Sequence, residues 1–289
     1  MPDLTAPAPA KVNLVLDILG RRDDGYHELR TVLQTLSLAD VVTISTEAEA
    51  GISTSGPLAE GVPADESNLA WRAATALAAL SGRAAPAIHI HLEKHIPAAA
   101  GLGGGASDAA TVLRLLQRLW PEVNDDMLAA AANSIGSDEA FFLVGGTALA
   151  EGRGERVTPL AELAEHDAVV FVPRETLDAK TATLFRAVAK LPYDSGEATG
   201  TFLERHPRPL ATGDLSNAFE RVAFDCFPGL GALRNTIEAA ICEPVRLAGA
   251  GPTLFWIGEP GRGDAIASAA GGCDADVIVT GTVGTPWVR

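Results

Sequence analysis

A glycine-rich segment most restricts what this chain can fold into. Residues 97–110 read PAAAGLGGGASDAA, and four of the five positions from Gly101 to Gly105 are glycine. Apolar residues follow at 109, 110, 112, 113, 116 and 119, which is the spacing of one helix face. A glycine loop that leads into a helix gathers unpaired N–H groups and the positive end of the helix dipole at one place. The segment therefore predicts a binding site for a phosphate.

The loop alone does not identify the kind of phosphate-binding protein. A P-loop would end in Gly-Lys-Ser/Thr, and protein kinases need a strand lysine and an aspartate triplet, all of which are missing here. The segment from Gly101 to Ala106 formally fits the dinucleotide fingerprint, but that motif needs a second apolar strand after the helix. Residues 121–126 read PEVNDD, which is typical of a polar turn. A glycine-rich surface turn without a ligand is the other alternative.

The charge and the cysteine content exclude several other classes of protein. The formal net charge of −15 argues against binding nucleic acid or an anionic membrane, so a phosphate ligand must be held by a few local groups. No apolar run is long enough to span a membrane, and no signal peptide is recognisable at the N-terminus. The three cysteines are widely spaced and odd in number. We expect a reduced, cytoplasmic protein.

The sequence predicts a mixture of strands and helices without strict βαβ alternation, and therefore the α+β class. Strands are expected over residues 10–19, 26–46, 88–92, 141–144, 145–149, 168–173 and 253–257. Helices are expected from a cap at Ser67 or Asn68 to residue 80, from the glycine loop to residue 119, and over 125–133, 178–190 and 229–242. The stretch before residue 213 is polar and rich in Gly, Pro and Thr.

Three sequence blocks, in this order, resemble the GHMP small-molecule kinases. They read APAKVNL (8–14) with GYHEL (25–29), IPAAAGLGGGASDAA (96–110) and LAGAGPTLF (247–255). The resemblance implies two domains with the active site in the cleft between them. Residues 1–155 would form an ATP-binding domain like domain 2 of ribosomal protein S5, and residues 156–289 a ferredoxin-like domain that contributes to substrate binding. The first block narrows the resemblance to family members that act on cytidine-diphosphate-linked methylerythritol.

The resemblance implies transfer of the ATP γ-phosphate to the 2-hydroxyl of that substrate, with Mg²⁺ as cofactor. Asp138, in the Gly136-Ser-Asp138 turn, would accept the hydroxyl proton, and Lys11 would lie beside it. Such a transfer needs in-line geometry, neutralised phosphate charge and a proton acceptor. As alternatives, Asp138 could be a turn or helix-cap residue, and Lys11 could protect an edge strand from aggregation.

The same resemblance assigns two sets of binding residues. The expected ATP-binding residues are Asn68, Lys94, Pro97, Ala98, Ala99, Ala100, Gly101, Leu102, Gly103, Gly104, Gly105, Ala106 and Ser107. The expected substrate-binding residues are Asn13, Tyr26, His27, Thr181, Phe185, Gly249 and Gly251. Ser107 would bind the ATP-bound Mg²⁺ or a phosphate oxygen, or else cap the helix, and Asn68 could equally be a cap. Tyr26 and Phe185 would stack on the cytosine while His27 reads its edge, although each aromatic could instead belong to the core.

Some features depart from the family pattern or leave other functions open. Ala140 replaces a usual proline, Ala250 a common serine, and Asp178-Ala-Lys180 a frequent Ser-Thr pair, which weakens the assignment of Thr181. His89 and His91 share a strand face, but no further ligand is spaced to complete a metal site. Alternative functions are a homoserine or mevalonate type of kinase, or a catalytically silent nucleotide-binding relative. Assembly as a monomer or a homodimer is expected.

Overall fold

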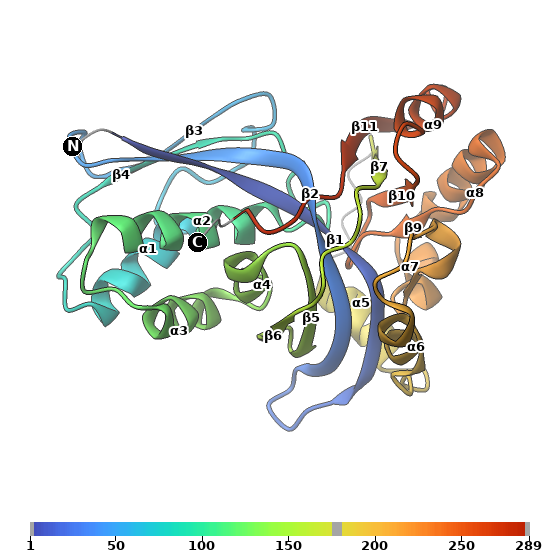
Figure 1. Ribbon diagram of the computed structural model, residues 1–289, viewed down its shortest axis with the longest axis horizontal. Helices are drawn as coiled ribbons and strands as arrows, with labels where there is room; N and C mark the ends of the chain where they lie inside the picture. The colour runs from blue at the N-terminus through green and yellow to red at the C-terminus, as the bar shows by residue number, and fades with distance from the viewer. Residues whose placement is uncertain (1–2, 175–180, 287–289) are drawn as a thin grey trace.

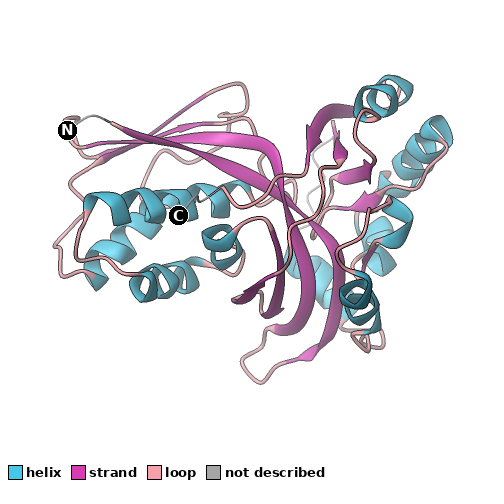
Figure 2. Ribbon diagram, viewed as in Figure 1, coloured by secondary structure: helices cyan, strands magenta, loops and turns pink. Residues whose placement is uncertain are grey.

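The computed structural model describes residues 3–174 and 181–286, and the structural statements below refer to those residues. Two β-sheets with helices packed on them make up the fold (Figure 1). Strands and helices follow one another irregularly along the chain (Figure 2). The predicted α+β class is therefore confirmed.

The larger sheet is built around one long hairpin. Its strands β1 (Leu4–Arg21) and β2 (His27–Ser45) pair antiparallel along nearly their whole length, which confirms the turn predicted before Tyr26. The strand order is β3-β4-β2-β1-β8; β5 pairs with the first half of β2, and β6 pairs with β5. The shorter strands are β3 (Gly51–Ser55), β4 (His89–Glu93), β5 (Thr147–Gly152), β6 (Arg156–Pro159) and β8 (Ser216–Asn217).

A shift in the pairing of β1 changes which way its side chains point. The register with β2 is irregular between Asn13 and Val15. Lys11 and Asn13 line the large cavity described below, whereas Val15 and Asp17 line a different one. A β-bulge redirects side chains in this way because the inserted residue breaks the strict alternation of the strand.

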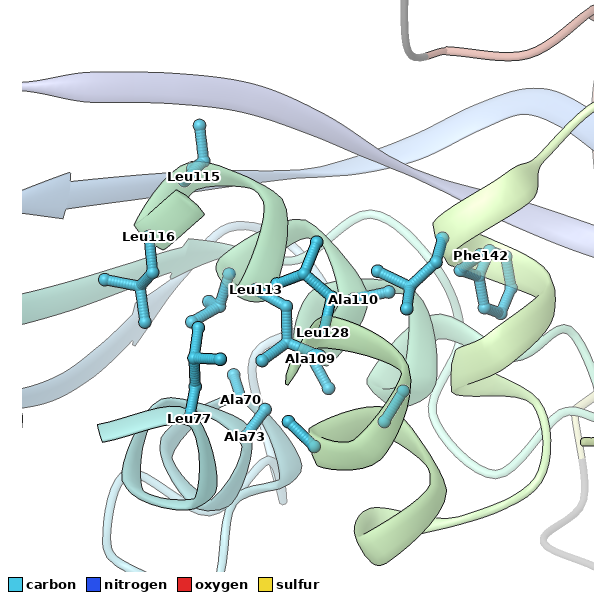
Figure 3. Packing of buried hydrophobic residues seen from close by; sticks show 14 of the residues in the cluster. Ala70, Ala73, Leu77, Ala109, Ala110, Leu113, Leu115, Leu116, Leu128 and Phe142 are labelled. Atoms are coloured by element: carbon cyan, nitrogen blue, oxygen red, sulfur yellow. The ribbon is translucent and has the colours of Figure 1, made fainter. Parts of the chain in front are cut away.

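Four helices cover one face of the larger sheet. They are α1 (Leu69–Leu80), α2 (Gly104–Leu119), α3 (Asp125–Ile135) and α4 (Glu139–Val144). The Asn68 side chain accepts a hydrogen bond of 2.9 Å from the backbone N–H of Ala70, so the predicted cap of α1 is confirmed. Side chains from all four helices, including Leu77, Leu113 and Phe142, meet in one buried cluster (Figure 3). Burial of this apolar surface fixes the start of α2, where the glycine loop ends.

The smaller sheet has the strand order β11-β7-β10-β9. Its strands are β7 (Asp167–Pro173), β9 (Arg246–Leu247), β10 (Leu254–Gly258) and β11 (Ala275–Gly281). The helices in this half of the chain are α5 (Thr181–Val188), α6 (Glu197–Arg205), α7 (Glu220–Cys226), α8 (Leu230–Ile241) and α9 (Gly263–Ala269), of which α6 packs against β1 and β2 of the larger sheet. The strands and the helix predicted near β7, β10 and α8 are confirmed.

Two predictions of secondary structure are wrong or incomplete. Residues 141–144 form part of α4 rather than a strand, because Phe141 and Phe142 pack into the helical cluster and Gly145 ends the helix. A four-residue apolar run fits a buried strand and a buried helix equally well. The polar stretch before residue 213 contains α6, which is short and buries only Thr199 and Phe202. The helix predicted over 178–190 is described from residue 181 onward, and Asp178-Ala-Lys180 lies outside the described residues.

A buried aspartate connects α6 to the long hairpin. The carboxylate of Asp17 is 5% exposed and accepts bonds from the Thr199 backbone N–H at 2.8 Å and from its hydroxyl at 2.6 Å. A buried carboxylate without hydrogen-bond donors would be costly. This contact therefore stabilises the junction between α6 and β1.

Thr199→Val should lower the free energy of unfolding by about 1–3 kcal/mol, because Asp17 loses one of its two donors while the side-chain shape is retained. Urea denaturation followed by circular dichroism measures the effect. Thr201→Val is the matched control, since Thr201 is an exposed residue of the same helix. Equal effects of the two substitutions would contradict the role given to Asp17.

Candidate active site

A large cavity of about 1140 Å³ lies where the two sheets meet. Its lining combines residues of β1, of the hairpin turn, of the glycine loop, of α5 and of the turn after β9. The predicted residues that line it are Lys11, Asn13, Tyr26, His27, Gly101, Gly103, Asp138, Thr181, Phe185 and Gly249. The structure thus brings together both predicted catalytic residues and most of the predicted substrate-binding residues.

A second cavity of about 370 Å³ lies on the other side of the glycine loop. The predicted residues that line it are Asn68, Lys94, Pro97, Ala98, Ala99, Ala100, Gly101, Gly103, Gly104, Gly105 and Ala106. Gly101 and Gly103 line both cavities, so the two spaces adjoin at the loop. Leu102, Ser107 and Gly251 line neither; Leu102 instead accepts a backbone hydrogen bond of 2.9 Å from Lys11.

Lys11 is held by a chain of hydrogen bonds that runs across the hairpin. Lys11 is only 4% exposed, and its ammonium donates to the side-chain oxygen of Asn13 at 2.9 Å. The Asn13 amide donates to the hydroxyl of Thr31 at 2.9 Å, and Thr31 donates to the carbonyl of Val15 at 2.7 Å. The buried position is not that of a lysine that shields a sheet edge. Asn13 was expected to bind substrate, and in the structure it also orients the ammonium.

The carboxylate of Asp138 faces the ammonium of Lys11. The distance from Lys11 Nζ to Asp138 Oδ2 is 3.5 Å, and the Asp138 side chain is 43% exposed. Asp138 occupies the N-cap position, directly before α4, but makes no side-chain capping bond. Its carboxylate is therefore left to interact with Lys11 and with the open cavity, as a proton acceptor at this place requires.

Two glycine turns approach each other closely beneath this pair. At Gly101, where φ is +82°, a Cβ atom would overlap the carbonyl oxygen of Ala248. At Gly249, where φ is +54°, a Cβ would lie 3.0 Å from both Gly101 O and Lys11 Nζ. Asn217 holds this second turn by donating to the carbonyls of Leu247 at 2.8 Å and Gly249 at 2.7 Å. Glycine is required here because any side chain would separate the two turns.

Lys94 differs from the other predicted ATP-binding residues because its charge is already paired. Its ammonium is buried and forms ion pairs with both Asp40 and Asp108. Burial alone would lower its pKa, but the two carboxylates raise it. The pKa of Asp108 is raised to about 7, chiefly by burial. Asp40 also accepts the backbone N–H of Ile96 at 2.8 Å, so this triad supports the entrance to the glycine loop.

Ser107 is a helical residue and does not cap α2. The N-cap position is occupied by Gly103, without a side-chain capping bond, which makes the cap interpretation of Ser107 wrong. Its hydroxyl is fully buried and has no hydrogen-bond partner among the described residues. The Oδ1 atom of the neighbouring Asp108 is also buried and has no hydrogen-bond partner among the described residues. Both groups therefore retain hydrogen-bonding capacity at the start of the helix.

The aromatic side chains of the cleft already stack on protein groups. The rings of His27 and Phe185 are stacked with centroids 4.7 Å apart, and the guanidinium of Arg153 lies 4.7 Å from the centroid of Tyr26. Burial and the charge of Arg21 lower the pKa of His27, which favours the neutral imidazole. His27 Nε2 is buried without a hydrogen-bond partner among the described residues.

Sequence reasoning missed several residues that shape the site. Thr31, Asp40 and Asn217 come from segments without a recognisable motif, and their partners lie far away in sequence. Arg153 lies outside the three sequence blocks that carry the family resemblance. The flanking Gly152 and Gly154 were the available signal, because glycines on both sides of an arginine indicate a tight turn that presents it.

Two other features lie away from this site. The imidazoles of His89 and His91 bond the hydroxyls of Ser53 and Ser55 at 2.8–2.9 Å, so this strand face is a polar network. A third cavity, of about 790 Å³, contacts Asp17 and contains none of the predicted site residues among those described. Within the described ranges, no helix is long and apolar enough to cross a membrane.

Comparison with known proteins places the chain in a family. A model of the GHMP kinases N terminal domain matches residues 68–146. A 4-diphosphocytidyl-2-C-methyl-D-erythritol kinase of Dehalococcoides mccartyi is 41% identical over 262 residues, which cover 87% of this chain and 88% of that protein. The chain belongs to the GHMP kinase family. A protein with the same description from Geobacter metallireducens is 39% identical over 88% of this GHMP kinase and 89% of its own length.

Solved structures agree with this assignment. A crystal structure of 4-(cytidine 5'-diphospho)-2C-methyl-D-erythritol kinase matches with a TM-score of 0.77 and 38% identity, covering 97% of this chain and 100% of that chain. A homoserine kinase of Cytophaga hutchinsonii matches with a TM-score of 0.69 at 16% identity, covering 99% of this chain and 96% of that chain. The second likeness concerns the fold alone. As a member of the family, this GHMP kinase is an ATP-dependent phosphotransferase.

Glu139, next to Asp138, is a buried acid that the site does not use. It is 3% exposed, and burial, followed by the charge of Asp138, raises its pKa to about 7. In the unfolded chain the same group titrates near 4.5. Between these two values the unfolded chain loses the proton while the folded protein keeps it. This group therefore lowers stability as the pH rises from about 4.5 to about 7, and the loss is complete above that window.

Glu139→Gln should remove this pH-dependent loss. Relative to the unsubstituted protein, we expect a gain in the free energy of unfolding below about 1 kcal/mol at pH 5 and up to about 3 kcal/mol at pH 8. Chemical denaturation at both pH values measures the difference. Glu60→Gln, at an exposed position, is the control and should give no such trend. A gain that is the same at both pH values would refute this account of Glu139.

Proposed function

We propose that this enzyme transfers the γ-phosphoryl group of ATP to the 2-hydroxyl of 4-diphosphocytidyl-2-C-methyl-D-erythritol, in non-mevalonate isoprenoid precursor biosynthesis. The supporting observation is the Lys11–Asp138 pair, 3.5 Å apart, in a cleft that adjoins the glycine-loop cavity at Gly101 and Gly103. Relatives about 40% identical over most of the chain are described as kinases for this substrate. The geometry of the Lys11–Asp138 pair and the descriptions of the relatives both favour an alcohol as the phosphoryl acceptor.

In this proposal Asp138 is the general base. The substrate hydroxyl oxygen attacks the γ-phosphorus, the bond to the bridging oxygen of ADP breaks, and Asp138 accepts the hydroxyl proton. Lys11 supplies positive charge next to the reacting groups, and Asn13 holds it in place. Because Asp138 is partly exposed and makes no capping bond, its carboxylate can accept that proton without loss of a helix cap.

The glycine loop and the start of α2 are proposed to hold the ATP phosphates. The loop has no side chains between Gly103 and Gly105, and a Cβ at Gly103 would lie only 2.8 Å from the ring of Phe142. Its N–H groups and the N-terminus of a sixteen-residue helix favour anions at this position. Asn68 lines the same cavity and would bind the adenosine end as well as capping α1.

Mg²⁺ is proposed to enter with ATP. The described residues include no group of three or more His, Cys, Asp or Glu side chains that could hold a metal ion, and Mg²⁺ in such enzymes is commonly held largely by the nucleotide phosphates. The unpaired hydroxyl of Ser107 fits a role as one further oxygen ligand or as a donor to a phosphate. When bound, Mg²⁺ neutralises charge on the phosphate oxygens.

The aromatic end of the cleft is proposed to bind the cytosine. Tyr26 offers a half-exposed ring, and Phe185 faces the same cavity from α5. The unpartnered Nε2 of a neutral His27 can bond the edge of a base. Since His27 stacks on Phe185 in the structure, the base replaces that contact or adds to the stack. Thr181 and Gly249 complete the substrate contacts in this proposal.

The alternatives are less well supported. Homoserine and mevalonate kinases resemble this chain at 14–18% identity, which supports a common fold and no common substrate. A catalytically silent relative would have no need of the paired Lys11 and Asp138.

Division into domains 1–155 and 156–289 stays a proposal, with the hairpin of β5 and β6 spanning the boundary. The cytoplasmic location and the monomeric or homodimeric state also remain predictions.

A coupled assay of ADP release with a panel of alcohols tests the proposed substrate. We expect turnover with 4-diphosphocytidyl-2-C-methyl-D-erythritol and competition by CMP, because the base contacts contribute to binding. Homoserine and mevalonate serve as the comparison substrates. Preferred turnover of either one, without competition by CMP, would overturn the proposal.

Asp138→Asn should lower turnover by about 10²-fold or more, the usual size of the effect of a positioned base, while ATP affinity is unchanged. Steady-state kinetics and ATP titration measure the two quantities separately. Asp126→Asn, an exposed residue of α3, is the matched control. Unchanged turnover in Asp138→Asn would remove Asp138 from its role.

A further inference from the structure

The substrate cleft has an excess of positive charge that the predicted catalytic pair does not use. Besides Lys11, its lining includes Arg21, Arg153, Arg186 and Lys190, whereas Asp138 is the single carboxylate among the described lining residues. In the described part of the chain, none of the four additional side chains forms an ion pair. For a protein of net charge −15, such a local reversal of sign indicates an anionic ligand.

Among these cations, Arg153 has the most defined position. It lies in the turn between β5 and β6, flanked by Gly152 (φ +76°) and Gly154 (φ +118°). The turn rests on Ser137, since a Cβ at Gly154 would lie 3.4 Å from the Cβ of that residue. The Arg153 backbone N–H is fixed by Glu155 Oε2 at 2.5 Å. Arg153 is thereby anchored next to the residue that precedes Asp138.

The guanidinium of Arg153 rests on a ring and forms no ion pair in the described residues. It lies 4.7 Å from the centroid of Tyr26, whose side chain is 53% exposed, and the nearest charge known to act on it, that of Asp24, does so from beyond ion-pair distance. A contact between a cation and an exposed ring is weak. A guanidinium presents several donors in a planar fork that matches two phosphate oxygens. Arg153 can therefore leave the ring at little cost when a stronger acceptor enters.

We propose that Arg153 forms a diphosphate subsite of the cleft. In the free enzyme its guanidinium lies over the ring of Tyr26. When the ligand binds, the pyrimidine stacks on that ring instead, and the guanidinium binds the diphosphate of the ligand. This inference rests on the proposed function, because it takes a cytidine diphosphate as the ligand. The ring contact keeps the guanidinium beside the cleft before binding. The arginine and the base then use the same ring in turn.

Arg186, which also lines the cleft, fits this role less well. The guanidinium of Arg186 already donates to the carbonyl of Ala182 at 3.3 Å and to the hydroxyl of Thr183 at 3.1 Å, within its own helix. Arg153 and Tyr26 do not line the glycine-loop cavity, so the ATP phosphates are not the obvious partner of Arg153. The subsite is thus separate from the nucleotide loop and belongs to the acceptor substrate.

The proposal predicts opposite effects of Arg153→Ala on two ligands. Cytidine carries no phosphate and competes with Arg153 for the ring, so its affinity should stay the same or rise up to about 5-fold. CDP loses charge-assisted hydrogen bonds, so its affinity should fall about 10–100-fold. Arg153→Lys restores the charge without the fork and should recover only part of the loss. In steady-state kinetics the KM for the cytidine diphosphate substrate should rise.

Calorimetric titration of cytidine and CDP into the full-length enzyme tests this proposal. Arg156→Ala is the matched control, because it removes a charge from the next strand, outside the lining of the cleft, and should leave both affinities unchanged. Equal weakening of cytidine and CDP by Arg153→Ala, or no change in either, would overturn the subsite. Failure of the unsubstituted enzyme to bind either ligand would instead overturn the proposed function, and the subsite with it.

Discussion

The close approach of two glycine turns is the constraint on which the site depends. The loop at Gly101 contacts the backbone at Ala248, and the turn at Gly249 reaches both Gly101 and the ammonium of Lys11. Two segments about 150 positions apart in sequence therefore meet with no side chain between them. Because Leu102 also bonds the backbone of Lys11, strand β1 is joined to this contact. One side of the meeting point is the glycine-loop cavity, proposed to hold ATP, and the other is the larger cleft, proposed to hold the acceptor substrate.

The protein buries two lysines near this point and treats their charges differently. Lys94 is paired with two buried aspartates, so its charge is fully used in supporting the loop. Lys11 has one half-exposed carboxylate at 3.5 Å and an uncharged amide at 2.9 Å. A buried ammonium with so little compensation attracts further negative charge. The same residue type is therefore structural in one place and available to a phosphoryl group in the other, and the difference lies entirely in the neighbouring carboxylates.

The sequence could predict what depends on local signals. The long hairpin, the Asn68 cap and the helix after the glycine loop each follow from a few adjacent residues. It could not predict that residues 141–144 are helical, because only the packing of two phenylalanines against other helices decides between helix and strand. The roles of Asp40 and Asn217 could not be predicted from the sequence either. Asp40 contacts the backbone N–H of Ile96 and the ammonium of Lys94, and Asn217 contacts a backbone carbonyl, and only the fold brings these partners near. Motifs thus identified the groups at the centre of the site, while the supporting contacts required the structure.

The distribution of charge explains how an acidic protein can hold two anionic ligands. A net charge of −15 repels phosphates at a distance, and salt screens that repulsion beyond about 10 Å. Binding must then come from short-range groups: the backbone donors of the glycine loop on one side and unpaired cations on the other. The two sets are not interchangeable, because the loop offers fixed N–H groups, whereas Arg153 rests on an aromatic ring and can move. In the proposed function the fixed loop would hold the phosphate donor, and the cations of the cleft would hold the acceptor.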